Sequence, residues 1–103
     1  MKFKKRWTGA TSDEVMIAKA NKRQKGLNSG GIKRILVTNG HASNGTLVRI
    51  YIDDGTNEYD LLKTTMPAET SLILSDFLSY NGGKYDLKIT LATAGYDITV
   101  MIK

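Results

Sequence analysis

Apolar and polar residues alternate along much of the chain, most clearly over residues 84–103. Every second residue is apolar from Tyr85 to Leu91, and the same alternation returns from Tyr96 to Ile102. A period of two sends successive side chains to opposite faces of a β-strand, so each segment has one apolar face. Only the short break Thr93-Ala94-Gly95 separates the two segments. The pattern therefore predicts an antiparallel hairpin.

Shorter runs of the same kind are separated by turn residues. Strands are predicted over residues 32–39, 46–53, 58–64 and 70–74, with a shorter strand or a turn at 76–78. A hairpin loop is predicted at Asp53–Asn57, where Gly55 is suited to positive φ. Pro67 marks a break, because proline cannot donate to a central ladder. Many short, turn-marked strands predict an all-β domain over residues 32–103, an antiparallel β-sandwich or jelly-roll-like fold.

Residues 1–31 are predicted to form a basic N-terminal arm with one strand or short helix. Thr11-Ser12-Asp13-Glu14 fits a helix capping box, and good helix formers follow it. On the other hand, Val15 and Ile17 alternate with Met16, and no helical stripe continues past Ala20. We prefer a strand near residues 13–20 followed by a polar loop over 21–31, and keep the helix as the alternative.

The charge of the chain is concentrated near its start. Residues 1–35 contain ten Lys or Arg and two acids, whereas residues 36–103 contain five Lys or Arg and eight acids. Such asymmetry is typical of an arm that lies on an acidic partner or on nucleic acid, or of a solvated tail. The absence of cysteine excludes disulfides and thiolate chemistry. We expect no signal peptide and no membrane span, because no long apolar run is present.

Candidate catalytic residues are few. His41 is the single histidine and lies in a Gly-rich turn, so it has no second histidine or cysteine to act with. The segment 53–58 is rich in the oxygen ligands that calcium prefers, but it lacks the spacing of a helix-loop-helix site, and a hairpin turn explains the same residues. No phosphate-binding glycine loop is present. We therefore expect no enzyme active site, no metal and no cofactor.

The basic residues are candidates for binding nucleic acid. They could neutralise several phosphates, with a steep salt dependence. The set comprises Lys4, Lys5, Arg6, Lys19, Lys22, Arg23, Lys25, Lys33 and Arg34, with Trp7 among them. Contact with an acidic protein surface accounts for these residues equally well. Two interpretations of Trp7 have equal weight. Its side chain could stack on a base or anchor in a pocket of a partner, or it could fold back and cover the open end of the protein's own core.

The order of features over residues 32–103 resembles that of small β-sandwich structural proteins in the virions of tailed bacteriophages. The resemblance rests on "IKRILVTNG", then "VRIYIDDGTNEYDLLKTTMPAETSLIL", then the final "YDITVMIK". The segment from Leu61-Leu62-Lys63 through Pro67-Ala68 to Leu72 is its most specific part. The basic N-terminal stretch matches less well.

The resemblance implies a decoration (cement) protein on a capsid or, alternatively, a neck, tail or fibre component of the virion. Such proteins bind the major capsid or tail subunits and their own copies, often as trimers or in arrays, so a homo-oligomer in the virion is expected. Within the arm we predict that a set of aromatic and basic side chains mediates the contact with the partner. This set is Phe3, Lys5, Arg6, Trp7, Lys22, Arg23 and Lys25. Nucleic acid is the second choice of partner.

A third hypothesis is a carbohydrate-binding sandwich that uses its tyrosines as platforms. These are Tyr51, Tyr59, Tyr80, Tyr85 and Tyr96. Strand tyrosines are more often packing residues with a wet hydroxyl group. The sequence thus predicts an all-β fold and leaves three classes of binding partner in competition.

Overall fold

The computed structural model describes residues 3–19, 32–78, 82–92 and 97–103, without the side chains of 76–78. It contains eight strands and, within the described residues, no helix. The strands are β1 (Phe3–Trp7), β2 (Thr11–Ile17), β3 (Ile32–Asn39), β4 (Thr46–Asp53), β5 (Glu58–Met66), β6 (Thr70–Leu78), β7 (Asp86–Leu91) and β8 (Ile98–Ile102). The predicted all-β class is confirmed.

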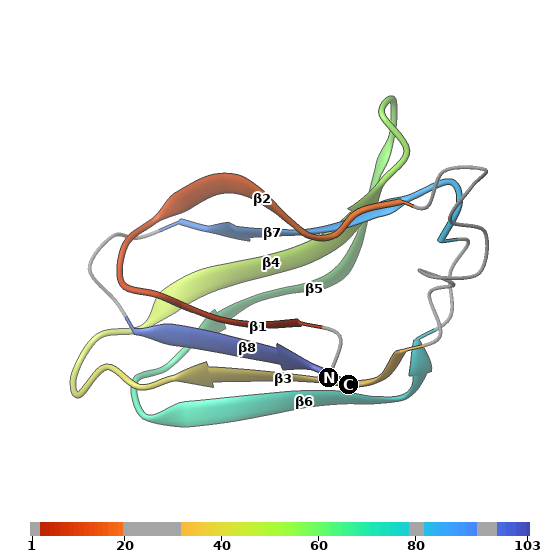
Figure 1. Cartoon of the computed structure of the whole chain (residues 1–103). Coiled ribbons are helices and arrows are strands. Elements are labelled where there is room, and N and C mark those ends of the chain that lie inside the picture. Colours follow the sequence, from red (N-terminus) through yellow and green to blue (C-terminus); the bar gives the residue numbers. More distant parts are fainter. Residues whose placement is uncertain (1–2, 20–31, 79–81, 93–96) are drawn as a thin grey trace.

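The strands form two four-stranded antiparallel sheets that pack as a sandwich (Figure 1). Sheet A has the strand order β1-β8-β3-β6, and sheet B has the order β2-β7-β4-β5. This is the strand order of an eight-stranded jelly roll, in which the chain passes repeatedly from one sheet to the other. Among consecutive strands, only β4 and β5 pair with each other.

The hydrophobic core lies between the two sheets and consists of the inward side chains of the alternating pattern. Sheet A contributes residues such as Ile35, Val37 and Val100, and sheet B contributes residues such as Ile50 and Ile89, all fully buried. Each strand has one apolar face, and two such faces must cover each other. The alternation read from the sequence is therefore the direct cause of the two-layer architecture.

The hairpin predicted for residues 84–103 is wrong. Both of its strands exist, but β7 pairs with β2 and β4 in sheet B, whereas β8 pairs with β1 and β3 in sheet A. Leu87 and Val100 consequently belong to opposite layers of the core. Alternation identifies a strand with one apolar face, but it does not determine which sheet receives that strand.

The hairpin predicted around Gly55 is confirmed. β4 and β5 pair from Asp53 and Glu58 to Thr46 and Met66, with one register shift at Tyr51. Gly55 has φ of 97°, which is the left-handed region that favours glycine. The segments predicted at 70–74 and 76–78 are one continuous strand, β6, and Pro67 ends the preceding strand as expected.

The described part of the predicted arm belongs to the sandwich. β1 pairs with β8 from Phe3 opposite Ile102 to Trp7 opposite Ile98, and β2 pairs with β7. Residues 3–17 therefore form one strand of each sheet rather than a separate arm. The strand alternative for residues 13–20 is confirmed as far as Ile17, whereas the predicted polar loop over 21–31 lies outside the described residues.

Candidate functional site: the outer face of sheet A

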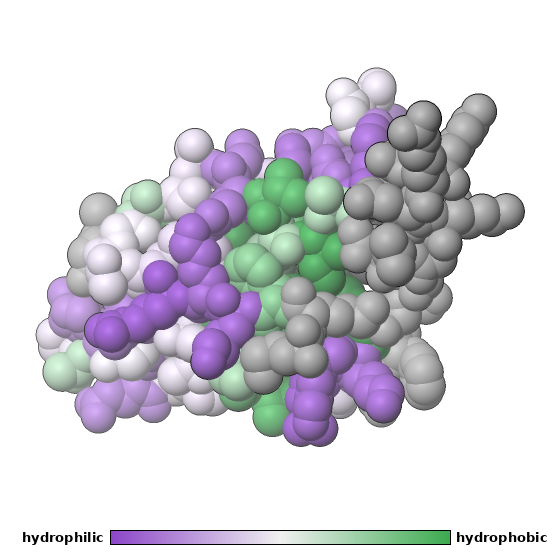
Figure 2. Space-filling view, viewed as in Figure 1, coloured by the Kyte–Doolittle hydropathy of each residue, from purple (hydrophilic) through white to green (hydrophobic). Residues whose placement is uncertain are grey.

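The aromatic residues of the predicted contact set pack within the sandwich. Trp7 is buried, and its ring stacks on Phe3 with centroids 6.0 Å apart. The indole Nε1 donates a hydrogen bond to Glu14 of β2, and Glu14 also forms an ion pair with Lys5. Since β1 and β2 are edge strands of different sheets, Glu14 joins the two sheets along this side. In Figure 2, apolar side chains gather where β2 and β1 run, with polar side chains around them.

The two basic members of the predicted set within the described residues, Lys5 and Arg6, are both exposed, and Arg6 lies on the opposite face of β1 from Phe3 and Trp7. Its guanidinium group binds the carboxylate of Asp97 through two contacts, Nε to Oδ1 at 2.6 Å and Nη2 to Oδ2 at 3.1 Å. This bidentate pair ties β1 to the residue that precedes β8. Lys22, Arg23 and Lys25 lie outside the described residues.

His41 organises the loop between β3 and β4. Its Nδ1 accepts hydrogen bonds from the backbone N–H groups of Ser43 and Asn44, at 3.1 and 3.0 Å. The fully buried Asn39 supports the same loop, donating to the carbonyl groups of Asn44 and Met66 and accepting from the backbone N–H of His41. Sequence reasoning missed Asn39, because nothing in the pattern distinguishes a buried strand-end asparagine from a turn residue.

The carboxylates of the β4–β5 hairpin accept hydrogen bonds from the loop's own backbone, and Asp53 also forms an ion pair with Lys88 of β7 at 2.8 Å. Asp53 accepts a hydrogen bond from the backbone N–H of Gly55, and Asp54 accepts from those of Thr56 and Asn57. These backbone hydrogen bonds lower the pKa of Asp54. The loop is therefore built as a hairpin turn. In the described part of the chain, no group of three or more His, Cys, Asp or Glu side chains is placed to hold a metal ion.

The outer face of sheet A carries an apolar row that runs across three strands. Leu36 of β3 lies opposite Met101 of β8 on one side and opposite Ile73 of β6 on the other. Ile73 is 55% exposed, one of the most exposed large apolar side chains of the described residues. Antiparallel neighbours in register are close enough for their side chains to touch, so the three residues form a continuous stripe.

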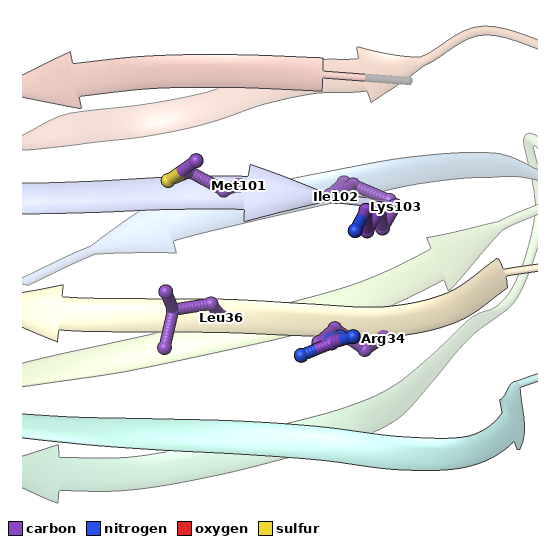
Figure 3. A pocket seen from close by; sticks show the side chains of 5 residues that line it. All are labelled: Arg34, Leu36, Met101, Ile102 and Lys103. Atoms are coloured by element: carbon purple, nitrogen blue, oxygen red, sulfur yellow. The ribbon is translucent and has the colours of Figure 1, made fainter. Parts of the chain in front are cut away.

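Basic side chains lie along one side of this row. Arg34 and Lys103 line, together with Leu36 and Met101, a shallow groove of about 180 Å³ (Figure 3). The backbone N–H of Arg34 donates to the carbonyl of Lys103, which fixes the two residues side by side. On the opposite side of the apolar row, Thr38 hydrogen-bonds Ser71 at 3.1 Å. The surface thus combines an apolar row with basic side chains along one side and small polar side chains along the other.

The outer face of sheet B is covered by a polar network centred on Tyr51. This ring is fully buried although it lies outside the core, because the guanidinium carbon of Arg49 lies 3.9 Å from its centroid. The hydroxyl of Tyr51 donates to Asp13 of β2, and Thr90 of β7 lies 2.7 Å from the same carboxylate oxygen. Arg49 also binds Asp60 of β5 at 2.6 Å, so the network connects all four strands.

The pKa values on sheet B follow from these contacts. Hydrogen bonds from Tyr51 and Thr90 lower the pKa of Asp13, while burial and the bond to Asp13 raise the pKa of the Tyr51 phenol. Burial opposes the charge of Arg49, but its acidic partners outweigh this effect and raise its pKa. The described charged groups of this face thus stabilise one another.

The tyrosines do not form a shared platform in the described chain. Tyr51 is covered, and Tyr59 packs edge-on against Tyr85 with centroids 6.0 Å apart. Tyr80 and Tyr96 lie outside the described residues. Stacking on a sugar requires an exposed ring face, which the covered Tyr51 does not offer.

Comparisons with known proteins found no match to this chain among family models, curated proteins or solved structures. No helix within the described ranges is long and apolar enough to span a membrane. The chain is a small two-sheet β-sandwich whose most distinctive surface is the outer face of sheet A.

Proposed function

We propose that the chain is a non-enzymatic assembly protein that binds neighbouring protein subunits through the outer face of sheet A. The observation that carries this proposal is the partly exposed row of Met101, Leu36 and Ile73 with Arg34 and Lys103 beside it. An apolar stripe next to charged side chains is typical of a protein interaction site. The basic side chains favour a partner with acidic residues beside its apolar contact.

The specific form of this proposal is a structural protein of a phage virion. Its support is the resemblance over residues 32–103 together with the jelly-roll strand order, an architecture that capsid proteins use. A decoration protein bound to capsid subunits is our first choice. A neck, tail or fibre component is the alternative. Because fold does not determine function, the virion assignment depends on a direct test.

The test is to sediment particles from cells that produce the chain and to quantify it in them by mass spectrometry. A copy number comparable with that of the major capsid subunit supports decoration, whereas a few copies per particle support a neck or tail position. Absence of the chain from every particle fraction contradicts the virion proposal.

A pair of variants tests the surface itself. Met101→Glu places a carboxylate in the apolar row and is expected to abolish incorporation. Thr65→Glu places the same charge at an exposed position of β5, on the other sheet, and is expected to incorporate normally. Equal incorporation of both variants would exclude the outer face of sheet A as the contact.

Nucleic-acid binding is the second candidate, and one observation favours it. Lys4, Arg34 and Lys103 lie on or beside the outer face of sheet A, which concentrates positive charge there. A fluorescence titration with short DNA and RNA at several salt concentrations separates the two functions. A steep decrease of affinity with salt supports phosphate contacts, and no binding at low salt removes this candidate.

A further inference from the structure

β6 is an edge strand with an open side. It spans Thr70–Leu78 and, among the strands that the structure describes, has β3 as its sole neighbour in sheet A. Half of the backbone N–H and C=O groups of an edge strand point away from the sheet, where they can pair with another strand. The pairing with β3 is regular from Arg34 opposite Ser75 to Asn39 opposite Thr70, so this edge is straight over six residues.

The other three edge strands carry features that oppose the addition of a strand. β1 is short and contains three consecutive basic residues, Lys4 to Arg6. The pairing of β2 has two register shifts. The pairing of β5 has one, between Asp60 and Leu62, and β5 also carries the charges of Glu58 and Asp60. Charges and irregular register are the usual protections of a sheet edge. β6 also contains one charge, Asp76, and its pairing with β3 has one register shift, between Ile32 opposite Leu78 and Arg34 opposite Ser75. Both lie beyond Ser75, so residues 70–75 have no charge, no proline and no register shift to oppose the addition of a strand.

The sequence of this edge reads the same in both directions. Residues 71–75 are Ser-Leu-Ile-Leu-Ser, centred on Ile73. A two-fold axis requires that residue i of one copy meets residue j of the other and that j meets i. In an antiparallel pair centred on Ile73, Ser71 faces Ser75, Leu72 faces Leu74, and Ile73 faces its own copy. Over residues 71–75 every position of such a pair is matched in size and polarity, and in the same register Thr70 faces Asp76, so no like charges oppose each other.

The two faces of the strand fit the same arrangement. Leu72 and Leu74 are partly buried and pack against the core, so pairing would cover their remaining exposed surface. Ile73 points to the outer face, where it ends the apolar row that begins at Met101. In Figure 2 an apolar group projects at the lower margin, where β6 runs in Figure 1. In such a pair, the apolar rows of the two copies would meet at Ile73 and form one continuous stripe across the two-fold axis.

We propose that the protein forms a two-fold symmetric dimer in which β6 pairs antiparallel with β6 of a second copy, centred on Ile73. Sheet A of one copy then continues into sheet A of the other as one eight-stranded sheet. This is strand addition with a second copy as the ligand. The dimer proposal does not depend on the virion proposal, because the isolated protein contains every group that the dimer contact requires.

The mass in solution, measured by light scattering at sub-millimolar concentration, tests the dimer. We expect twice the chain mass for the wild type and a monomer for Ile73→Lys, because two lysines would face each other across the axis. Thr65→Lys places the same charge on exposed β5 and should remain dimeric. A monomeric or trimeric wild type, or a dimer that Ile73→Lys leaves intact, would overturn the proposal.

The register is tested by cross-linking, since the chain has no cysteine of its own. Directly opposed residues of an antiparallel pair have Cα atoms about 5 Å apart, within reach of a disulfide. Ile73→Cys should therefore form a covalent dimer under mild oxidation. Ser71→Cys should not, because its copy lies four residues away along the strands, about 13 Å.

A double variant completes the register test. Ser71→Cys with Ser75→Cys should restore the covalent dimer, because the two positions face each other in the predicted register. Cross-linking of Ser71→Cys alone with the same efficiency as Ile73→Cys would contradict the register and with it the dimer centred on Ile73. Circular dichroism of each reduced variant confirms that the sandwich is folded.

Discussion

The two outer faces of the sandwich have similar backbones and opposite surface chemistry. On sheet B, Tyr51 is buried under Arg49, and its hydroxyl group is bound by Asp13. On sheet A, Leu36 and Ile73 form part of an apolar row next to Arg34. The side chains of sheet B thus bind one another, whereas the apolar row of sheet A has its surface open to a partner.

This difference indicates a division of roles between the faces. A network that connects four strands through one tyrosine stabilises the fold, because each strand is held by the others. An apolar row that is only partly buried contributes less to the stability of a single copy than a covered one, and burial of its remaining surface against a partner is favourable. We therefore expect substitutions on sheet B to change stability and substitutions on sheet A to change association.

Replacement of the central tyrosine should have the largest effect. Tyr51→Ala removes a fully buried ring from the outer face of sheet B and should lower the free energy of unfolding by about 3 kcal/mol. Urea denaturation followed by circular dichroism measures the change. Tyr51→Phe keeps the ring and removes the hydrogen bond to Asp13, so it should cost about 1 kcal/mol. Equal losses for both variants would show that the ring contributes nothing.

Removal of the guanidinium group should have the next largest effect. Arg49→Ala uncovers Tyr51 and breaks the contacts with Asp60 and Glu58, so we expect a loss of about 1 kcal/mol. Arg49→Lys retains the charge but loses the flat group that covers the ring. Thermal unfolding of the two variants separates these contributions, and unchanged stability in both would remove Arg49 from the network.

Acid should also lower the free energy of unfolding through sheet B, by less than the substitutions of Tyr51 and Arg49. The pKa of Asp13 is lowered by hydrogen bonds from Tyr51 and Thr90, and that of Asp53 by a hydrogen bond from Lys88 and then by Gly55. A carboxylate whose pKa is lower in the folded than in the unfolded chain stabilises the fold at any pH above its unfolded pKa of about 4. This stabilisation is lost as the pH falls through the pKa of the folded state.

Urea titrations between neutral pH and pH 3 measure this loss. Asp13→Asn should reduce the slope of unfolding free energy against pH in that window, because the variant has no proton to take up there. A slope identical to that of the wild type would show that Asp13 does not stabilise the folded state through its charge.

Substitution on sheet A should have the smallest effect on the stability of one copy. Met101→Thr lies on the partly exposed outer face and should change the free energy of unfolding by no more than about 0.5 kcal/mol. The same variant should reduce incorporation into the proposed particle. A loss of stability as large as that of Tyr51→Phe would mean that the apolar row supports the fold rather than a partner.

The alternation in the sequence predicted the strands well because burial of one face directly requires it. The hairpin at Gly55 was also predictable, since a short loop fixes which strands pair. The pairing of β7 and β8 was not, because the alternation of Tyr85 to Leu91 fits either sheet equally well. Sheet assignment depends on partners far away in the chain, which no local pattern records.

The candidate site was harder to predict for the same reason. The apolar row brings together Leu36, Ile73 and Met101, which lie on three separate strands and become neighbours only through the register of sheet A. Phe3 and Trp7 attracted attention because they stand among basic residues, yet they pack on the core. An aromatic residue in a basic segment therefore does not by itself indicate an exposed contact.

The order of the strands also determines when the chain can fold. Within the described sheets, β1 pairs only with β8, and β2 pairs only with β7. During synthesis, β1 and β2 therefore cannot pair with their neighbours until residues 86–102 have left the ribosome. Closing loops of this length slows folding, because chain entropy is lost before any contact forms. Formation of the complete sandwich therefore requires residues 3–17 to pair with strands that lie within residues 86–102.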